Sequence, residues 1–89
     1  MKKAELNEIV KDGQARGKHF LVVKIITEGA PAPEIILNPE ENFRSKIAYY
    51  NKAYNDNLEL ISALENGKRI YIEDAIATSN LNDLNWFCY

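Results

Sequence analysis

The sequence predicts a single α+β domain whose elements follow the order α-β-β-α-β-α. Two patterns support this: a run rich in β-branched residues at 18–27, and a long stretch with helical apolar spacing between 38 and 67. Proline or glycine lies at most of the boundaries. A chain of 89 residues is the size of one domain, which we expect to span 1–89. We expect a three-stranded, mainly antiparallel sheet packed on one long helix, with two shorter helices.

The first helix and the first strand are distinguished by their apolar spacing. Apolar residues recur at helical spacing from Leu6 to Val10, which predicts a helix over about Lys3–Ala15. Gly17 is expected to adopt the left-handed conformation just past its end. β-branched and aromatic residues then predict a strand over Lys18–Thr27. Both faces of this strand are mostly apolar, so we expect it to be central in the sheet.

Prolines separate this strand from a second, shorter one. Glu28–Pro33 contains two prolines and a glycine, which interrupt ladder hydrogen bonds and predict a hairpin loop. Glu34–Leu37 is then expected to form a strand antiparallel to the first. Asn38-Pro39 is expected to end it.

A long helix is predicted from Asn38 to the Asn66-Gly67 stop signal. Asn38 is expected to be the N-cap, with Pro39 at the first helical position and Glu41 three residues after the cap. The residues of its expected core stripe, spaced three and four apart, are Phe43, Ile47, Tyr50, Tyr54, Asn57 or Leu58, Ile61 and Leu64. The polar run 55–57 is a point of interruption, although no proline or glycine forces a break there.

A third strand and a short helix complete the predicted fold. Lys68–Asp74 alternates between apolar and polar residues, as a half-buried strand does. The expected core-facing residues are Ile70 and Ile72, and the outward-facing residues are Arg69, Tyr71 and Glu73. Thr78 or Ser79 is expected to cap a helix over Asn80 to about Phe87. The second face of the sheet is half apolar, so we expect the N-terminal helix, the aromatic tail or a second chain to cover it.

Composition and charge argue against several classes of protein. The net charge of −2 gives no general attraction to nucleic acid or to an anionic membrane. The chain shows no signal-peptide pattern and no apolar run of about 18 residues, so we expect no membrane association and a cytoplasmic location. The single cysteine, Cys88, rules out an internal disulfide and is consistent with a reducing compartment.

No residue pattern predicts catalysis, a cofactor or a metal. His19 is the only histidine, and sequence assigns it no acidic partner. Cys88 lies between aromatic residues, where packing is the simpler explanation. Glu73 and Asp74 are adjacent in a strand, so their side chains point apart, which disfavours a metal site with Asp83. We therefore expect a non-enzymatic protein without a cofactor.

Aromatic residues mark the expected partner-binding surface. Tyr49 lies off the core stripe, on a flank that it shares with Ala53 and Leu60. Trp86 and Tyr89 belong to an aromatic tail that either closes the core or docks on a partner. Tyrosine and tryptophan are the residues that most often contribute interface energy. The expected partner-binding residues are Tyr49, Lys24, Arg69, Tyr71, Glu73, Trp86 and Tyr89.

A second hypothesis is a small accessory factor that binds single-stranded nucleic acid. Residues 1–24 hold six of the eleven basic residues, and the outward sheet face combines basic with aromatic side chains, which can stack on bases. The residues that it would use are Phe20, Tyr71, Lys24, Arg69, Lys2, Lys3, Lys11, Arg16 and Lys18. These residues form a small binding surface, and the net negative charge would repel a nucleic-acid backbone. Protein binding is therefore the preferred hypothesis.

Three segments carry a resemblance to a known family: GKHFLVVKI, APAPEIILNPEENFRSKIAYYNKAYNDNLEL and RIYIEDA. Together they cover roughly Gly17–Asp74. They resemble a family of short uncharacterised proteins of phages and prophages in Gram-positive bacteria, from which no residue role can be transferred. The resemblance implies a small accessory protein in the bacterial cytoplasm. Such a protein would act by stoichiometric binding to a host protein or by self-association, for example as a counter-defence inhibitor.

Overall fold

The computed structural model describes residues 1–87, apart from the side chain of Trp86. Its elements, where η marks a 3-10 turn, are α1 (Lys3–Ala15), β1 (Phe20–Thr27), β2 (Glu34–Pro39), η1 (Glu40–Asn42), α2 (Phe43–Ala53), α3 (Ile61–Glu65), β3 (Ile70–Thr78), η2 (Leu81–Asp83) and α4 (Leu84–Phe87). The α+β class is confirmed. The predicted first helix agrees with α1, and the three predicted strands agree with β1, β2 and β3 within a few residues at each end.

The three strands form one antiparallel sheet in the order β2-β1-β3. The predicted central position of β1 is confirmed. The register between β1 and β3 shifts between Lys24 and Ile25, because Lys24 lies opposite Asp74 whereas Ile25 lies opposite Ile72. Glu73 is the extra residue of this β-bulge, which twists the strand and re-aims its side chains.

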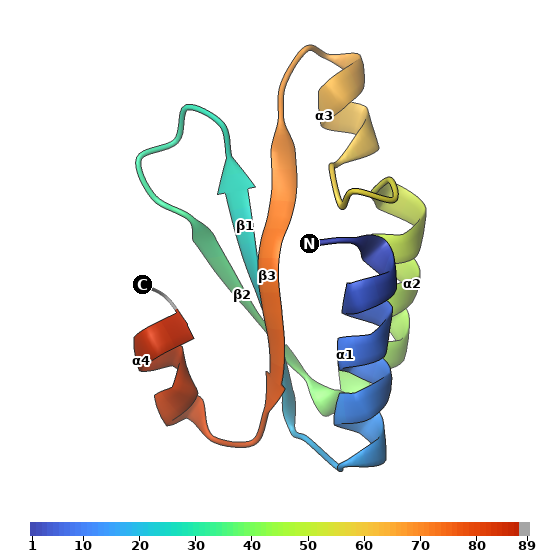
Figure 1. The fold of residues 1–89 in the computed structure, drawn as a ribbon, viewed down its shortest axis with the longest axis vertical. Coiled ribbons are helices and arrows are strands. Elements are labelled where there is room, and N and C mark those ends of the chain that lie inside the picture. The colour runs from blue at the N-terminus through green and yellow to red at the C-terminus, as the bar shows by residue number, and fades with distance from the viewer. Residues whose placement is uncertain (88–89) are drawn as a thin grey trace.

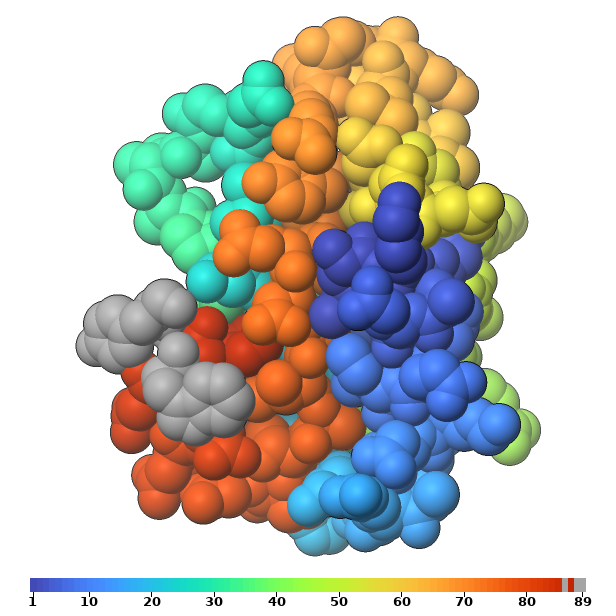
Figure 2. Space-filling model, viewed as in Figure 1, coloured from blue at the N-terminus to red at the C-terminus, as the bar shows by residue number. Residues whose placement is uncertain are grey.

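Helices lie on both faces of the sheet. Figure 1 shows α1, α2 and α3 on one face and α4 on the other, and in Figure 2 the atoms of α1 border those of β3. The core between the sheet and the first group of helices is apolar and aromatic. Its buried residues are Leu6, Val10, Leu21, Val23, Ile25, Phe43, Tyr50, Tyr54, Leu58, Ile72 and Ala75. The N-terminal helix therefore covers the same face as α2, and α4 contributes cover to the second face.

A glycine lets α1 approach β3 closely. A Cβ atom added at Gly13 would lie 2.5 Å from the Cβ atom of Ala77. Gly17 has φ +66° just past the end of α1, as predicted for its stop signal. One glycine thus sets the contact between helix and sheet, and the other ends the helix.

The predicted long helix is interrupted at the polar run 55–57, where the sequence left a break open: it is two helices, α2 and α3, separated by residues 54–60. The Asn55 side-chain oxygen accepts hydrogen bonds from the backbone N–H groups of Asn57 and Glu59, both at 3.0 Å. This turn competes with the helix for the same backbone groups. Leu58 then adopts φ +56°, a conformation that an α-helix cannot contain.

Pairing with the sheet stabilises the interruption. The Leu60 N–H donates to the Ile70 carbonyl at 2.8 Å, and the Ile72 N–H donates to the Leu58 carbonyl at 2.9 Å. The Leu58 side chain is fully buried in the core. Residues 58–60 therefore run beside the outer edge of β3 in place of continuing the helix.

Asn38 is not the predicted helix N-cap, because it lies within β2 and is buried. Its side-chain amide donates to the Leu21 carbonyl at 3.3 Å and to the Tyr50 hydroxyl at 3.5 Å. Buried polar groups require partners, and these two contacts supply them. The strand continues to Pro39, and η1 precedes α2.

The last helical segment also begins differently from its prediction. β3 extends to Thr78, and the side chain of Asn80 accepts from the Asn82 N–H at 3.0 Å. Asn80 is therefore the N-cap in place of Thr78 or Ser79. The Thr78 hydroxyl instead donates to Asp83 Oδ2 at 2.6 Å, which ties the end of β3 to η2.

Candidate functional site

The interruption of the predicted helix leaves an open groove between α2 and α3. Its volume is about 410 Å³. The residues that line it are Tyr49, Lys52, Ala53, Ile61, Ser62 and Glu65, and we call it the Tyr49 groove. The lining combines apolar side chains with one cation and one anion, which is the usual composition of a protein-binding patch with a polar rim.

Tyr49 is held at the groove by an aromatic cluster. Its ring centroid lies 5.5 Å from that of Tyr50 and 6.3 Å from that of Tyr54, both in edge-to-face geometry. The Lys46 ammonium group lies 5.9 Å from the Tyr49 ring centroid. Tyr50 and Tyr54 are buried, whereas Tyr49 is half exposed. The ring is therefore packed along one side and open on the other, so its binding to a partner would cost little conformational entropy.

Two further apolar side chains are exposed on α3. Ile61 is 39% exposed and Leu64 is 41% exposed, beside Tyr49 at 50%. Both were predicted on the core stripe of one continuous helix, and that prediction is wrong because residues 54–60 rotate α3 relative to α2. The sequence signal that marks this change is the polar run 55–57.

A second hollow also has Tyr49 in its lining. Its volume is about 320 Å³. It is lined by Ile25, Thr27, Glu34, Ile36, Lys46, Tyr49, Tyr50, Tyr54, Leu60 and Ile70. The predicted flank of Tyr49, Ala53 and Leu60 is thus divided: Ala53 lines the Tyr49 groove and Leu60 lines this second hollow.

Arg69 is the centre of a charged cluster at one end of the sheet. Its Nε atom lies 3.1 Å from Glu59 Oε2, and its Nη1 atom lies 3.9 Å from Glu28 Oε2. Its guanidinium carbon lies 4.3 Å from the centroid of the Tyr71 ring. Hydrogen bonds from Asn55 and then from Arg69 hold the pKa of Glu59 below its usual value. The cluster sets two carboxylates against the single cation of Arg69, which leaves Arg69 less available to an anionic ligand.

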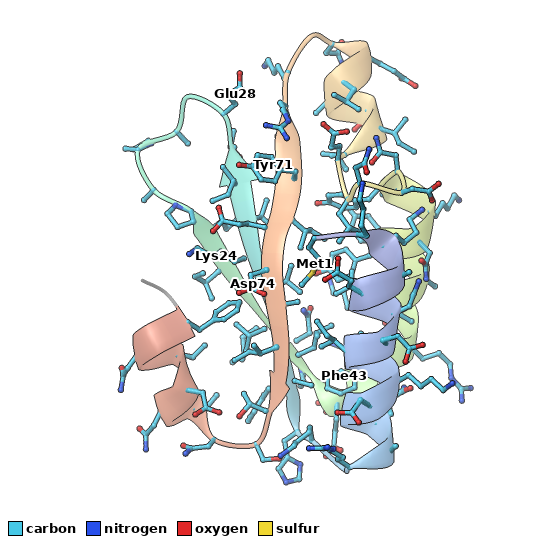
Figure 3. The ribbon with its side chains drawn as sticks, in the orientation of Figure 1. Met1, Lys24, Glu28, Phe43, Tyr71 and Asp74 are labelled. Carbon is cyan, nitrogen blue, oxygen red and sulfur yellow. The ribbon has the colours of Figure 1, made fainter. Side chains whose placement is uncertain are left out.

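Lys24 is similarly engaged on the second face of the sheet. Its side chain is only 12% exposed, and its Nζ atom lies 3.4 Å from Glu73 Oε1. Figure 3 shows Lys24, Tyr71 and Asp74 on the side of β3 away from α1, whereas Met1 and Phe43 lie on the helix side. In β3, Ile72 lies opposite Ile25 and is buried in the core, whereas Tyr71 lies opposite Ile26 on the second face. The predicted inward position of Ile72 and outward position of Tyr71 are therefore confirmed.

The predicted partner-binding residues therefore fall into separate groups. Tyr49 lies on α2, whereas Lys24, Arg69, Tyr71 and Glu73 lie on or beside β1 and β3, on the second face. Trp86 belongs to α4, but its side chain and all of Tyr89 lie outside the described residues. Phe87, from the same aromatic tail, is buried within this chain and belongs to α4, on the second face of the sheet.

Several N-terminal basic side chains contact groups within the chain. Lys2 donates to the Asn57 side chain, Lys3 donates to the Asn51 carbonyl at 2.8 Å, and Arg16 lies 3.3 Å from Asp12. Lys2 and Lys3 therefore bond neutral groups and keep their charge. Arg16, Lys24 and Arg69 are paired with carboxylates, which offsets part of the positive charge on which the nucleic-acid hypothesis depends.

The other chemical candidates are explained by local contacts. His19 Nδ1 lies 3.1 Å from Glu40 Oε1, both on exposed side chains, so the histidine joins the start of β1 to η1. Within the described residues, no group of three or more His, Cys, Asp or Glu side chains is arranged to hold a metal ion. In the same part of the chain, no helix has the length and apolar character that crossing a membrane requires.

Fold and surface together define a small α+β domain with an aromatic groove on its helical face. Comparison with known protein families, with characterised proteins and with solved structures finds no significant match to this chain.

Proposed function

We propose that this chain is a small non-enzymatic accessory protein of the phage type that binds a host protein stoichiometrically in the bacterial cytoplasm. Its role would be that of a counter-defence inhibitor. The observation that carries the binding proposal is the half-exposed Tyr49, which lies with exposed Ile61 at one open groove. The phage context rests on the sequence resemblance alone.

The physical case for this surface rests on clustering. Five large hydrophobic side chains are exposed among the described residues, and three of them, Tyr49, Ile61 and Leu64, lie on α2 and α3. Tyr49 and Ile61 line the same groove, and exposed apolar residues that gather in this way mark an interaction site more often than scattered ones do. Tyr49 is also pre-positioned by Tyr50 and Tyr54, which is the property of an interface anchor.

Nucleic-acid binding is less well supported than protein binding. Lys24 and Arg69 are each within 3.4 Å of a carboxylate oxygen. A ligand phosphate would have to displace those carboxylates, so the outward sheet face offers little net attraction to a nucleic-acid backbone.

The test is affinity capture from a lysate of a Gram-positive host, followed by reconstitution with the purified captured protein. Tyr49→Ala and Ile61→Glu are the test variants. Leu81→Glu is the matched control, because Leu81 is an exposed leucine on η2, outside the groove lining. We expect a 1:1 complex that each test variant weakens by at least about tenfold, or about 1.4 kcal/mol, and that the control retains.

Two results would count against the proposal. One is a partner whose affinity is the same for wild type, Tyr49→Ala and Ile61→Glu. The other is retention of single-stranded DNA or RNA in a salt-dependent manner without any protein partner, which would favour the nucleic-acid hypothesis.

A further inference from the structure

The two edges of the sheet are protected to different degrees. At the β3 edge, residues 58–60 donate to and accept from the backbone of Ile70 and Ile72. Farther along the same strand, the bulge at Glu73 interrupts the regular ladder. A covering segment and a bulge are two of the devices by which proteins prevent edge strands from pairing with other chains.

The β2 edge has neither device. β2 is the outer strand in the order β2-β1-β3, and among residues 1–87 no segment pairs with its outer side. The only charge and the only proline of β2 are at its two ends, Glu34 and Pro39, and residues 35–38 contain neither. Charged side chains and prolines within the strand are the usual means of blocking an edge. Every second residue of such a strand turns its N–H and C=O groups outward, ready to pair.

We propose that β2 pairs with β2 of a second copy of this chain, so that two three-stranded sheets join into one continuous antiparallel sheet. This inference uses a different surface from the Tyr49 groove, because that groove is lined from α2 and α3. Tyr49 itself also lines the second hollow with Glu34 and Ile36 of β2, so a residue that lines the groove alone separates the two surfaces. The partner is a second copy because the strand is complementary to itself in one register.

Symmetry limits the possible registers, and the residues of β2 favour one of them. A two-fold axis normal to the sheet keeps both helical layers on the same face, so residues that lie opposite each other must project from the same face. With Ile36 opposite Ile36 of the second copy, Ile35 lies opposite Leu37, and Glu34 lies opposite Asn38. Apolar residues then meet apolar residues, and the only charged residue of the strand meets an amide. No like charges are brought together.

The exposed side chains of β2 are consistent with pairing to a second copy of the strand. Leu37 is 44% exposed in the middle of the strand and projects from the second face, opposite Val22 of β1. Pairing would bring Leu37 beside Ile35 of the second copy and cover both. An extended peptide from an unrelated protein could form the same backbone hydrogen bonds, but it would not require the sequence of β2 to be self-complementary.

The test is the oligomeric state of the purified full chain, measured by sedimentation velocity from about 1 µM to about 200 µM, where small interfaces associate. Wild type is expected to shift from monomer to dimer across this range. Leu37→Lys places a charge at the interface on a side chain that is already exposed, and we expect at least a tenfold weaker dimer with unchanged far-ultraviolet circular dichroism.

Leu81→Lys and Ile61→Glu are the matched controls and should retain the wild-type dimer. Leu81 is 46% exposed, close to the 44% of Leu37, but lies on η2. Ile61 lines the Tyr49 groove and not the hollow beside β2, so retention by Ile61→Glu also separates this inference from the proposed function. Slower amide hydrogen exchange at residues 35–37 in the dimer would support the pairing. A wild type that stays monomeric throughout, or equal dissociation by Leu37→Lys and Leu81→Lys, would overturn it.

Discussion

The backbone N–H of Ile72 donates a hydrogen bond of 2.9 Å to the carbonyl of Leu58. This bond joins the middle of β3 to a residue that apolar periodicity places inside a helix. Leu58 reaches this position with φ +56° and with its side chain fully buried. The contact stabilises the break between α2 and α3, the two helices that line the Tyr49 groove.

The left-handed conformation of Leu58 predicts that the usual order of stability of an alanine and a glycine variant is reversed at this position. Leu58→Ala removes a buried side chain and should cost about 2–5 kcal/mol. Glycine normally costs about 0.5–1 kcal/mol more than alanine, but at positive φ it avoids the steric penalty that alanine retains. We therefore expect Leu58→Gly to be at least as stable as Leu58→Ala in urea unfolding. A variant Leu58→Gly that is less stable than Leu58→Ala by about 1 kcal/mol would contradict this conformation.

The contact between Gly13 and Ala77 predicts that a substitution at one position restores the stability lost by a substitution at the other. Gly13→Ala should raise helix propensity by about 1 kcal/mol, yet its new Cβ atom would lie 2.5 Å from that of Ala77. We expect a net destabilisation of about 1–3 kcal/mol from this overpacking. Ala77→Gly in the same chain removes the opposing atom.

Thermal unfolding of the four variants in the Gly13→Ala and Ala77→Gly cycle measures the coupling. The double variant should be more stable than the sum of the two single changes by at least about 1 kcal/mol. Additive effects would mean that α1 and β3 do not approach each other at this point.

Much of the fold follows from local sequence signals, and the exceptions have a common cause. Gly17 ends α1 where its position predicts, and the prolines of residues 31–33 mark the hairpin loop. Tyr50, Tyr54 and Leu58 are spaced as on one helical face and are all buried, so the pattern alone does not reveal that the helix has ended. Pairing of residues 58–60 with β3 is a tertiary interaction, which outweighs helix propensity here.

The candidate surface was predictable only in part for the same reason. Tyr49 lies off the core stripe, and its exposure agrees with its position on the helix. Ile61 and Leu64 continue the stripe in sequence, and the polar run 55–57 marks a break without indicating that they face outward. Asn38 has the identity of an N-cap, but its use as a buried partner of Leu21 and Tyr50 depends on the packing of three separate elements.

The aromatic cluster predicts a loss of stability at alkaline pH. Burial, followed by the proximity of Tyr49 and Tyr50, raises the pKa of Tyr54 to about 12. The neutral phenol is therefore favoured in the folded state. Its contribution is complete below the unfolded pKa of about 10 and is lost as the pH rises from about 10 toward about 12.

Tyr54→Phe tests this contribution, because it retains the ring and removes the titrating group. We expect wild type and variant to have similar pH dependence near neutrality. Above about pH 10, wild type should lose stability more steeply, by at most about 1.4 kcal/mol per pH unit for one group. Urea unfolding between about pH 8 and about pH 11 measures the difference. Parallel curves for the two proteins across this range would contradict the raised pKa.

Site-specific photo-crosslinking from position 49 tests the central claim most directly, namely that the Tyr49 groove is where this chain binds another protein. A photoreactive phenylalanine analogue would replace Tyr49 in one protein and Leu81 in a second, and both would be irradiated in living bacterial cells. The account predicts one discrete heterologous adduct from position 49, in proportion to the amount of this chain, and none from position 81. An absence of adduct from position 49, or the same adduct from both positions, would contradict it.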